Sequence, residues 1–380
     1  MNGRKETMKI LYDYQAVYDQ KYGGISRYFY EVISRIKNDK KYKIVMPVVF
    51  SQNYYFRSLK AVEFNVNKGE KLIYRMINEM YTIIFLLIAK VKKDIDILHP
   101  TYYKALYLIY FPWLKPKNGK IVITVHDMIH EIYPKGNEGF IKRKKKVLDM
   151  ADGIITVSEK TKIDLLKFYP ELAKKNIKVI YHGNSVVNTE KNLDNSFILP
   201  SRYILFVGQR NAYKNFEIVI KAFSKLRKED LSLHLVCAGG GDFSEHENKL
   251  FQEYAIESCC IQHSVNDDLL SYMYQNAIVF VFPSLYEGFG IPILEAFANG
   301  CPIVLSNASC FPEIAGDAAL YFDGEDSCDL YFKLKSVIYN DACRYELIEK
   351  GKECLKKYSW EKAAAETMDF YETLSFSDKI

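Results

Sequence analysis

Two glutamates stand in a segment that could bind a charged ligand. Residues Phe282–Gly300 read FPSLYEGFGIPILEAFANG, with Glu287 before and Glu295 inside a helix expected over 291–299. A proline at its start and a glycine after its end fit the two termini of a helix. The N–H groups and positive dipole end at such an N-terminus form an anion site. Two carboxylates would therefore flank a bound anion.

This arrangement matches the layout of a sugar nucleotide, in which a diphosphate lies between sugar hydroxyls and ribose hydroxyls. Gly288 and Gly290 would let a ligand approach the backbone closely. The alternative is that both glutamates are solvated and the glycines only form a turn, since glycine-rich strand-to-helix turns are common in doubly wound folds.

A basic pair follows an expected strand in the segment 207–215, which reads VGQRNAYKN. Gly208 ends the strand, Arg210 offers a planar fork of donors and Lys214 offers a point charge. Both side chains would neutralise a departing diphosphate. The alternative is that they are surface residues at the start of a helix.

Two further strand ends carry polar or glycine-rich motifs. His126 could donate a hydrogen bond to a sugar hydroxyl or move a proton, and Asp127 could orient it; the alternative is a structural histidine. Gly23 and Gly24 begin a helix and form a weaker backbone site for phosphate. The order of glycines is not that of a dinucleotide-binding fingerprint.

These motifs all fall where strands meet helices. Short apolar strands alternate with helical patterns in two passages of the chain, which predicts two doubly wound parallel sheets with a cleft between facing domains. The polar stretch 183–200 is the expected linker. The predicted domains are 1–185 and 186–361, and a helix over about 362–380 is expected to pack back on the first. Strands are predicted at 9–12, 44–50, 95–99, 121–126, 153–158, 177–181, 203–208, 233–238, 277–283 and 302–306.

The composition is that of a globular protein of two domains, with 380 residues of which 49% are hydrophobic. The longest apolar run, 83–89, is shorter than a membrane span, no secretory signal is expected, and the eight cysteines show no metal-finger spacing. Residues 1–190 carry a net charge of +15 and the remainder −10. The first half is therefore expected to meet an anionic partner.

The motifs together resemble the retaining glycosyltransferases of family four. The element E-x7-E in EGFGIPILE is specific, and the Gly-Gly turn, VHD at 125–127, ADGIITVSE at 151–159, VGQRNAYKN and YSWEKAA at 358–364 support it in order and spacing. The resemblance covers nearly the whole chain and implies the GT-B fold, which has two facing Rossmann-like domains. It also implies a hexose donor bound mainly by the second domain, with GDP-mannose favoured weakly over UDP-sugars.

The resemblance assigns a role to each motif residue. Glu295 would bind the ribose and Glu287 the donor sugar, the amides of Phe289, Gly290 and Ile291 would meet sugar and phosphate, and His126 would touch the sugar. Arg210 and Lys214 would stabilise the diphosphate. Gln209 stands where the family often has its arginine, and Arg210 follows it. No cofactor and no metal ion is expected, because these cations and amides supply the positive charge that a metal supplies elsewhere.

The acceptor is expected to be a glycan or a polyprenyl-diphosphate-linked glycan in surface polysaccharide assembly. The protein is expected in the cytoplasm, with a peripheral contact on the inner face of the cell membrane. Three features suit a contact with anionic lipid: the basic run 142–146, the amphipathic stretch 74–93, and the residues Tyr54, Tyr55, Phe56, Arg57 and Lys60. A solvated helix face is the alternative for the basic run. No nucleic-acid partner is expected. The other functions considered are an epimerase or phosphorylase of the same fold and a non-catalytic sugar-nucleotide-binding protein.

Overall fold

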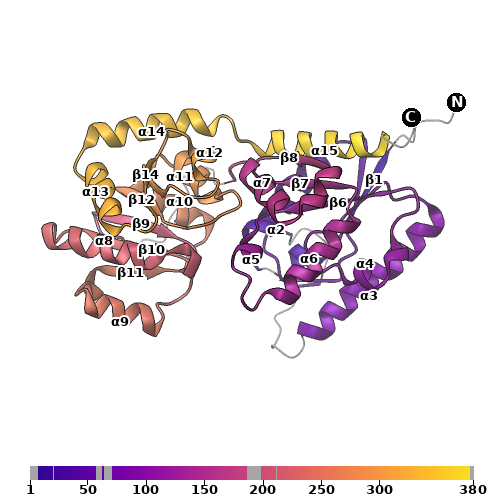
Figure 1. Cartoon of the computed structure of the whole chain (residues 1–380), viewed down its shortest axis with the longest axis horizontal. Helices are drawn as coiled ribbons and strands as arrows, with labels where there is room; N and C mark the ends of the chain where they lie inside the picture. The colour runs from indigo at the N-terminus through magenta and orange to yellow at the C-terminus, as the bar shows by residue number, and fades with distance from the viewer. Residues whose placement is uncertain are drawn as a thin grey trace. The chain divides into compact units, whose positions relative to one another are not determined.

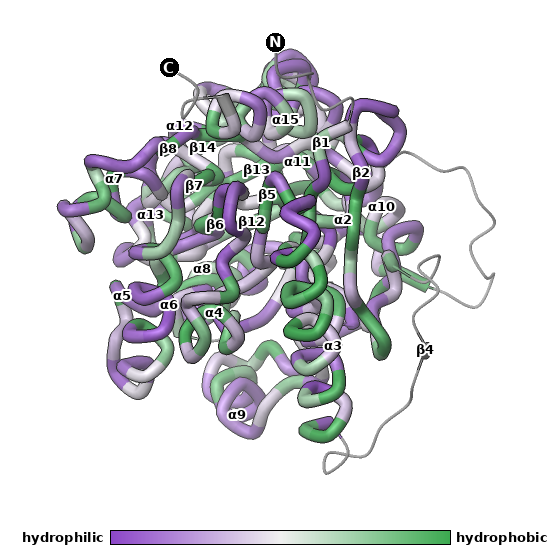
Figure 2. The backbone as a smooth tube through the Cα atoms, turned by 90° about the vertical axis from the view of Figure 1, so that its right-hand side faces the viewer, coloured by the Kyte–Doolittle hydropathy of each residue, from purple (hydrophilic) through white to green (hydrophobic). Residues whose placement is uncertain are grey.

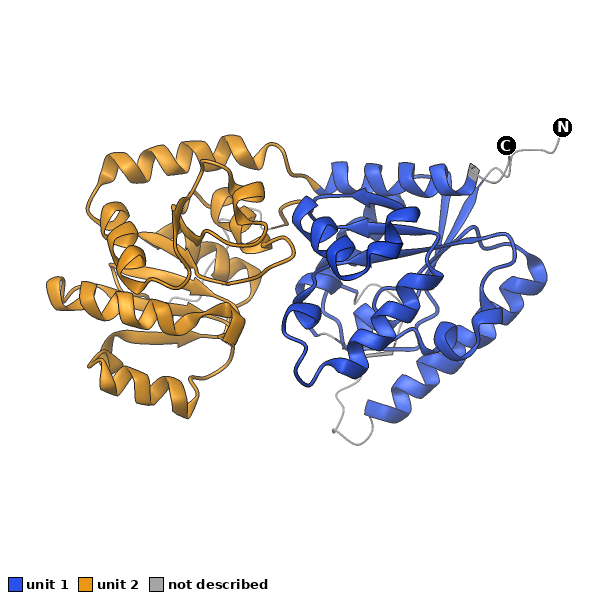
Figure 3. Ribbon diagram, viewed as in Figure 1, with its two compact units in different colours: residues 1–182, 360–380 blue, residues 183–359 orange. Residues whose placement is uncertain are grey.

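The computed structural model of the chain describes residues 7–19, 21–56, 62–63, 71–185, 198–210 and 212–376. Contacts divide the chain into two compact units (Figure 3). Unit 1 comprises Met1–His182 and Trp360–Ile380, and unit 2 comprises Gly183–Ser359. Arg57 and Lys60, and most of the predicted linker, lie outside the described residues.

Unit 1 is built on a six-stranded parallel sheet in the order β2-β1-β5-β6-β7-β8. The order reverses between β1 and β5, where ligands of doubly wound sheets bind beyond the carboxyl ends of the strands. Valine- and isoleucine-rich sequences form the strands because both faces of the sheet are covered. The strands are β1 (Met8–Tyr12), β2 (Tyr42–Val45), β5 (Ile97–His99), β6 (Lys120–Val125), β7 (Gly153–Thr156) and β8 (Asn176–Val179).

The helices of unit 1 include one that returns from the far end of the chain (Figure 1). This is α15 (Trp360–Phe376), which packs on α2 and buries Trp360 and Tyr371 in the core of unit 1. The other helices are α1 (Gln15–Asp19), α2 (Gly24–Ile36), α3 (Lys71–Lys92), α4 (Leu106–Tyr110), α5 (Ile129–Ile132), α6 (Glu138–Met150) and α7 (Glu159–Phe168), with the 3-10 helices η1 (Pro112–Leu114) and η2 (Pro170–Lys174). A short parallel pair is formed by β3 (Phe50–Ser51) and β4 (Val62–Glu63).

Unit 2 has a second six-stranded parallel sheet, in the order β11-β10-β9-β12-β13-β14. The order reverses between β9 (Tyr203–Val207) and β12 (Val279–Phe282), which pair directly. The other strands are β10 (His234–Ala238), β11 (Cys260–His263), β13 (Ile303–Ser306) and β14 (Leu320–Phe322). The helices are α8 (Phe216–Glu229), α9 (Glu245–Glu253), α10 (Asp267–Asn276), α11 (Ile291–Ala298), α12 (Phe311–Ala315), α13 (Ser327–Ile338) and α14 (Asp341–Leu355), with η3 (Ala212–Lys214) and η4 (Glu257–Cys259).

Two parallel sheets with crossover helices confirm the predicted α/β class. One strand prediction was wrong in extent, because 44–50 is split into the end of β2 and the start of β3. Pro47 lies between them and has no N–H to donate to a ladder. The exposed helix α3 and the strands β11 and β14 were not predicted as elements.

Candidate functional site

The two loops with predicted donor residues meet at the reversal point of the sheet in unit 2. The loop 208–215 follows β9, and the loop 283–290 follows β12, its direct neighbour. Leu285 N–H donates a hydrogen bond of 2.8 Å to the carbonyl oxygen of Tyr213 and ties the loops together. Sequence positions about 75 residues apart are thereby brought to one edge of the sheet.

Lys214 and Glu287 form an ion pair between these loops. The two side chains are largely buried, with 15% and 14% of their areas exposed, and the ammonium also lies 5.6 Å from the ring centre of Phe282. Ser309 holds the backbone of Glu287 on both sides, since Glu287 N–H donates to its hydroxyl and the hydroxyl donates to Glu287 O at 2.6 Å. A cation and an anion are thus fixed side by side.

Helix α11 begins at this pair. Gly290 precedes it with φ 87° and ψ 57°, a left-handed conformation that favours glycine. A Cβ on Gly290 would lie 3.1 Å from the side chain of Ile293 and 3.2 Å from that of Phe311. Phe289 is buried, and the amides of Phe289, Gly290 and Ile291 form the loop end and first turn. A helix leaves the N–H groups of its first turn without intrahelical acceptors, and the anion-binding role predicted for these amides stays a prediction.

Glu295 lies in α11 and is 5% exposed. Tyr274 of α10 donates a hydrogen bond of 3.3 Å to its Oε2. The same hydroxyl lies 3.4 Å from the carbonyl oxygen of Pro292, so Tyr274 links the carboxylate to the first turn of the helix. The predicted second acidic group is therefore held in place by its neighbours rather than solvated.

Arg210 is engaged by its own unit. Its Nε donates to Glu247 at 2.5 Å, Nη1 to the carbonyl of Gly239 at 3.1 Å, and Nη2 to the carbonyls of Gly241 and Asp242 at 2.8 and 3.0 Å. This guanidinium thus organises the glycine turn after β10. The diphosphate role predicted for it stays a prediction, and the structure directs the cation of Lys214, not that of Arg210, toward Glu287. Gly208 adopts φ 113° between β9 and this residue.

His126 follows β6 in unit 1 and is 9% exposed. Its ring makes edge contacts with Tyr28 and Phe29, and burial lowers its pKa from 6.5 to about 4, so the imidazole is neutral near pH 7. Its Nε2 has no hydrogen-bond partner among the described residues. This nitrogen is almost inaccessible to solvent, and its predicted contact with a sugar hydroxyl stays a prediction.

Asp127 makes a different contact from the one predicted. Its Oδ1 accepts a hydrogen bond of 3.0 Å from Ile129 N–H, and no hydrogen bond to His126 is among its described contacts. Its carbonyl accepts from the fully buried ammonium of Lys144 at 2.8 Å, which also donates to Glu131 Oε2 at 3.0 Å. Lys144 therefore supports the loop after β6, so the basic run 142–146 is not a uniformly solvated or lipid-facing surface.

Gly23 and Gly24 lie at the start of α2, where Gly23 is extended with φ 170°. The carbonyl of Gly23 accepts hydrogen bonds from Arg27 N–H and from the hydroxyl of Ser26, each at 3.0 Å. The pair thus forms a plain helix start. Their phosphate role stays a prediction.

Several supporting residues were missed by sequence reasoning. These residues lie far along the sequence from the motifs that they contact, and no spacing rule connects the two. They are Ser309, Tyr274, Glu247 and the Lys144–Glu131 pair. Asn215 was in a quoted motif, and it has φ 54° and donates to Gly324 O at 2.8 Å at the start of α8. Across the described residues, no group of three His, Cys, Asp or Glu side chains is placed to hold a metal ion.

Two family models match most of the chain. Residues 188–354 match the family described as glycosyl transferases group 1, and residues 22–186 match glycosyltransferase family 4. The chain is 27% identical over 286 residues to the O-antigen chain mannosyltransferase B of Escherichia coli, covering 69% of the chain and 72% of that relative. It is 29% identical over 226 residues to the O-antigen chain mannosyltransferase RfbU of Salmonella typhimurium, covering 57% of the chain and 60% of the relative.

The fold also agrees with a solved structure. The Anabaena protein HepE, in complex with UDP and glucose, superposes with a TM-score of 0.72 at 13% identity, over 96% of the chain and 99% of HepE. The chain has two Rossmann-like units, one of which carries Glu287 and Glu295 at its reversal point, and the family models match most of both units. The chain therefore belongs to the glycosyltransferases and has the GT-B fold.

Proposed function

We propose that the chain is a retaining glycosyltransferase that moves a hexose from a nucleoside-diphosphate sugar to a glycan or lipid-linked glycan of a surface polysaccharide. The Lys214–Glu287 pair beside the N-terminus of α11 carries the proposal, because it combines a cation, hydrogen-bond acceptors and backbone donors at the reversal point. GDP-mannose is the favoured donor, since two relatives are named mannosyltransferases of O-antigen chains. UDP-sugars come second, because the structural neighbour holds UDP and glucose.

The proposed donor orientation follows the charges. The diphosphate lies at the first turn of α11 and beside Lys214, Glu287 accepts hydrogen bonds from sugar hydroxyls, and Glu295 accepts from the ribose. The contact of His126 with a sugar hydroxyl, which the family resemblance implies, stays a prediction. In this orientation the ammonium and the amides contact phosphate oxygens, and the two carboxylates contact hydroxyl groups.

Bond breaking develops charge that this site is arranged to stabilise. The anomeric carbon–oxygen bond breaks with its electron pair going to the diphosphate, whose charge is met by Lys214 and the α11 amides. The acceptor hydroxyl adds to the anomeric carbon from the same face and passes its proton to the leaving phosphate oxygen, which retains the configuration. We propose that these fixed charges make a metal ion unnecessary.

Incubation with a panel of nucleotide sugars and a lipid-linked glycan tests the proposal. We expect a thermal shift and nucleoside diphosphate release with GDP-mannose, a product with the donor's anomeric configuration by NMR, and the same rate in EDTA. Binding without any turnover would instead identify a sugar-nucleotide sensor. An inverted product would rule out retention.

A further inference from the structure

Helix α3 of unit 1, labelled in Figures 1 and 2, carries many exposed apolar residues. Hydrophobic segments recur along its length in Figure 2, and a window of 18 residues has a mean hydropathy of 1.5 although only 22% of it is buried. By length and composition it is the one described helix that could cross a bilayer. Its exposed large apolar residues are Leu72, Ile73, Met76, Ile77, Met80, Tyr81, Ile84, Leu87, Ile88 and Val91.

These residues lie on one side of the helix. At 3.6 residues per turn, all of them except Leu72 at the helix start fall within an arc of about 140°. The charged residues of the helix lie outside this arc. The buried residues, Asn78, Thr82, Leu86 and Ala89, lie on the opposite side. The usual orientation of a surface helix, with its apolar side inward, is therefore reversed.

Polar side chains attach the inner side of α3 to the unit. Asn78 accepts from the N–H groups of Val49 and Phe50 at 2.9 and 3.0 Å and donates to Phe50 O at 2.9 Å. Glu79 accepts from the Tyr14 hydroxyl at 2.6 Å and from Tyr107 N–H at 2.7 Å. A membrane-spanning helix would lose these bonds and place the carboxylate of Glu79 in lipid, which is costly. The attachment therefore favours a helix lying parallel to a membrane surface.

Aromatic and basic residues border the apolar face. Exposed Tyr110 ends α4, exposed Trp113 lies in η1 and exposed Phe111 connects the two elements, both of which pack against α3. Lys90 contacts the carbonyl of Trp113, and its ammonium lies 5.3 Å from the Trp113 ring centre. Residues 71–93 contain five Lys and Arg and a single acidic residue. That residue is Glu79, whose carboxylate already accepts hydrogen bonds within the unit. An apolar face with aromatic and basic borders is complementary to an anionic bilayer, whereas a second copy would bring like charges together.

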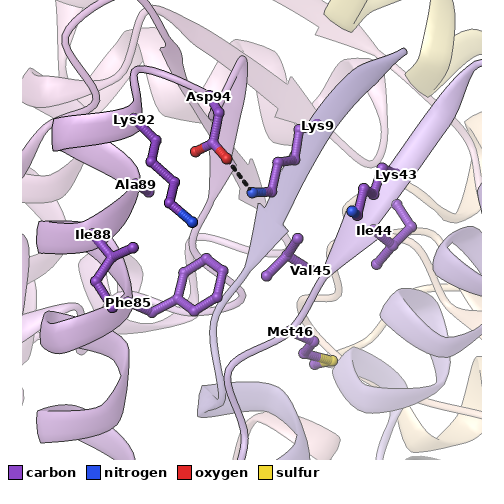
Figure 4. A pocket seen from close by; sticks show the side chains of 10 residues that line it. All are labelled: Lys9, Lys43, Ile44, Val45, Met46, Phe85, Ile88, Ala89, Lys92 and Asp94. Atoms are coloured by element: carbon purple, nitrogen blue, oxygen red, sulfur yellow. Dashed lines mark hydrogen bonds and ion pairs between the residues drawn. The ribbon is translucent and has the colours of Figure 1, made fainter.

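A pocket of about 470 Å³ adjoins this face between α3 and β2 (Figure 4). Lys9, Lys43 and Lys92 line it together with Asp94, and Lys9 is paired with Asp94 at 2.6 Å. Lys43 and Lys92 have no ion-pair partner among the described side chains. Phe85 and Ile88 of α3 line the same pocket, so two cations lie next to the apolar face. Three lysines against the one carboxylate of Asp94 leave the lining with a net positive charge beside apolar side chains, which suits a phospholipid phosphate next to its acyl chains.

We propose that α3 lies in the surface of an anionic bilayer, with its apolar face among the acyl chains and a phospholipid phosphate between Lys43 and Lys92. This inference rests on the proposed function in one respect: the membrane contact would bring the protein to a lipid-linked acceptor. Lipid binding is measured without donor or acceptor, so failure of either proposal is distinguishable from failure of the other.

Flotation of the full chain with vesicles tests this contact. We expect it to float with phosphatidylglycerol–phosphatidylcholine vesicles and much less with phosphatidylcholine alone. Ile84→Glu with Leu87→Glu should lower binding at least about tenfold, while Leu231→Glu with Phe332→Glu, exposed apolar residues of unit 2, should leave it unchanged. Lys43→Glu with Lys92→Glu should weaken binding about tenfold and reduce its salt dependence, in contrast to Lys221→Glu with Lys249→Glu.

Tryptophan fluorescence gives a second readout on the folded protein. Trp113 is exposed and Trp360 is buried, so vesicles should shift the emission to the blue in the natural chain but not in Trp113→Phe. Wild-type protein that stays with the soluble fraction, or apolar-face variants that float unchanged, would overturn the proposal. Membrane binding that resists extraction with alkaline carbonate would indicate a spanning helix. A dimer that is lost in the Ile84→Glu, Leu87→Glu variant would assign the apolar face to a second copy of the chain. Either result would overturn the proposal.

Discussion

The ammonium of Lys214 is paired with the carboxylate of Glu287, and this pair joins the loops after β9 and β12 at the reversal point of the sheet in unit 2. Each group thereby limits the position of the other. Opposite charges that are both needed by a ligand can be held together at little cost, since the ligand offers a phosphate to one and hydroxyls to the other.

Removing either partner should slow the reaction more than it weakens donor binding. Lys214→Ala is expected to lower kcat by about 10²- to 10³-fold, because its charge acts on the leaving diphosphate. Glu287→Gln should also lower kcat. Donor turnover assays with the proposed nucleotide sugar check this result. Lys335→Ala removes an exposed pair with Glu229 in the same unit and should leave kcat unchanged.

Glu295 is expected to act through the nucleoside. Glu295→Gln should raise the Kd of the nucleoside diphosphate about tenfold, because a hydrogen bond from a hydroxyl to a charged group contributes about 1.5 kcal/mol or more. The loss should vanish for a 2′,3′-dideoxy nucleotide, measured by calorimetry. An equal loss with the dideoxy nucleotide would mean that the carboxylate only supports Tyr274.

Two left-handed glycines at the ends of α11 provide a matched comparison. Gly290 has φ 87° and Gly300 φ 65°, so alanine at either should cost about 1–2 kcal/mol in backbone strain. A Cβ at Gly300 has its nearest neighbour at 3.9 Å, whereas at Gly290 the contacts are 3.1 and 3.2 Å. Gly290→Ala should therefore destabilise unit 2 more and weaken donor binding, while Gly300→Ala should bind the donor normally. Thermal unfolding with and without nucleotide separates the two effects.

The buried pair of Lys144 and Glu131 should stabilise unit 1 only as a pair. Both side chains are almost fully buried, and Tyr169 donates to Glu131 Oε1 at 2.9 Å. Lys144→Met should cost about 3–5 kcal/mol, because it leaves a buried carboxylate without its cation. Adding Glu131→Gln should recover much of that loss. Both tryptophans, Trp113 and Trp360, lie in unit 1, so their emission during urea unfolding reports this unit. Equal destabilisation in the single and double variants would contradict the prediction.

Unit 1 should lose stability as the pH falls from about 6.5 to 4. Burial lowers the pKa of His126 to about 4 and that of His99 to about 3, and lowers the pKa of His182 well below 6.5. The unfolded chain binds these protons at a pH where the folded unit does not, so acid favours unfolding, by up to about 1.4 kcal/mol per pH unit for each histidine. Urea unfolding at stepped pH measures the slope. His126→Asn should reduce it, whereas replacing the exposed His246 should not.

Several helices and strands could be predicted from the sequence because they depend on patterns of neighbouring residues. The helix expected over 291–299 is observed as Ile291–Ala298, because a proline in the first turn and a glycine after the end mark the two termini locally. Valine- and isoleucine-rich runs marked most strands for the same reason. Helix α3 was predicted only as an amphipathic stretch over 74–93, because residue spacing shows that one side is apolar but not that this side faces outward.

The sequence by itself determined the α/β class, the order of the motifs and the identity of the paired glutamates, because turn chemistry and strand pattern act between near neighbours. The tertiary structure decided which motifs meet. Only the pairing of β9 with β12 brings Lys214 to Glu287, and only the approach of the glycine turn after β10 engages Arg210. Hydrogen bonds and ion pairs between distant segments depend on strand order and register, which no local spacing encodes.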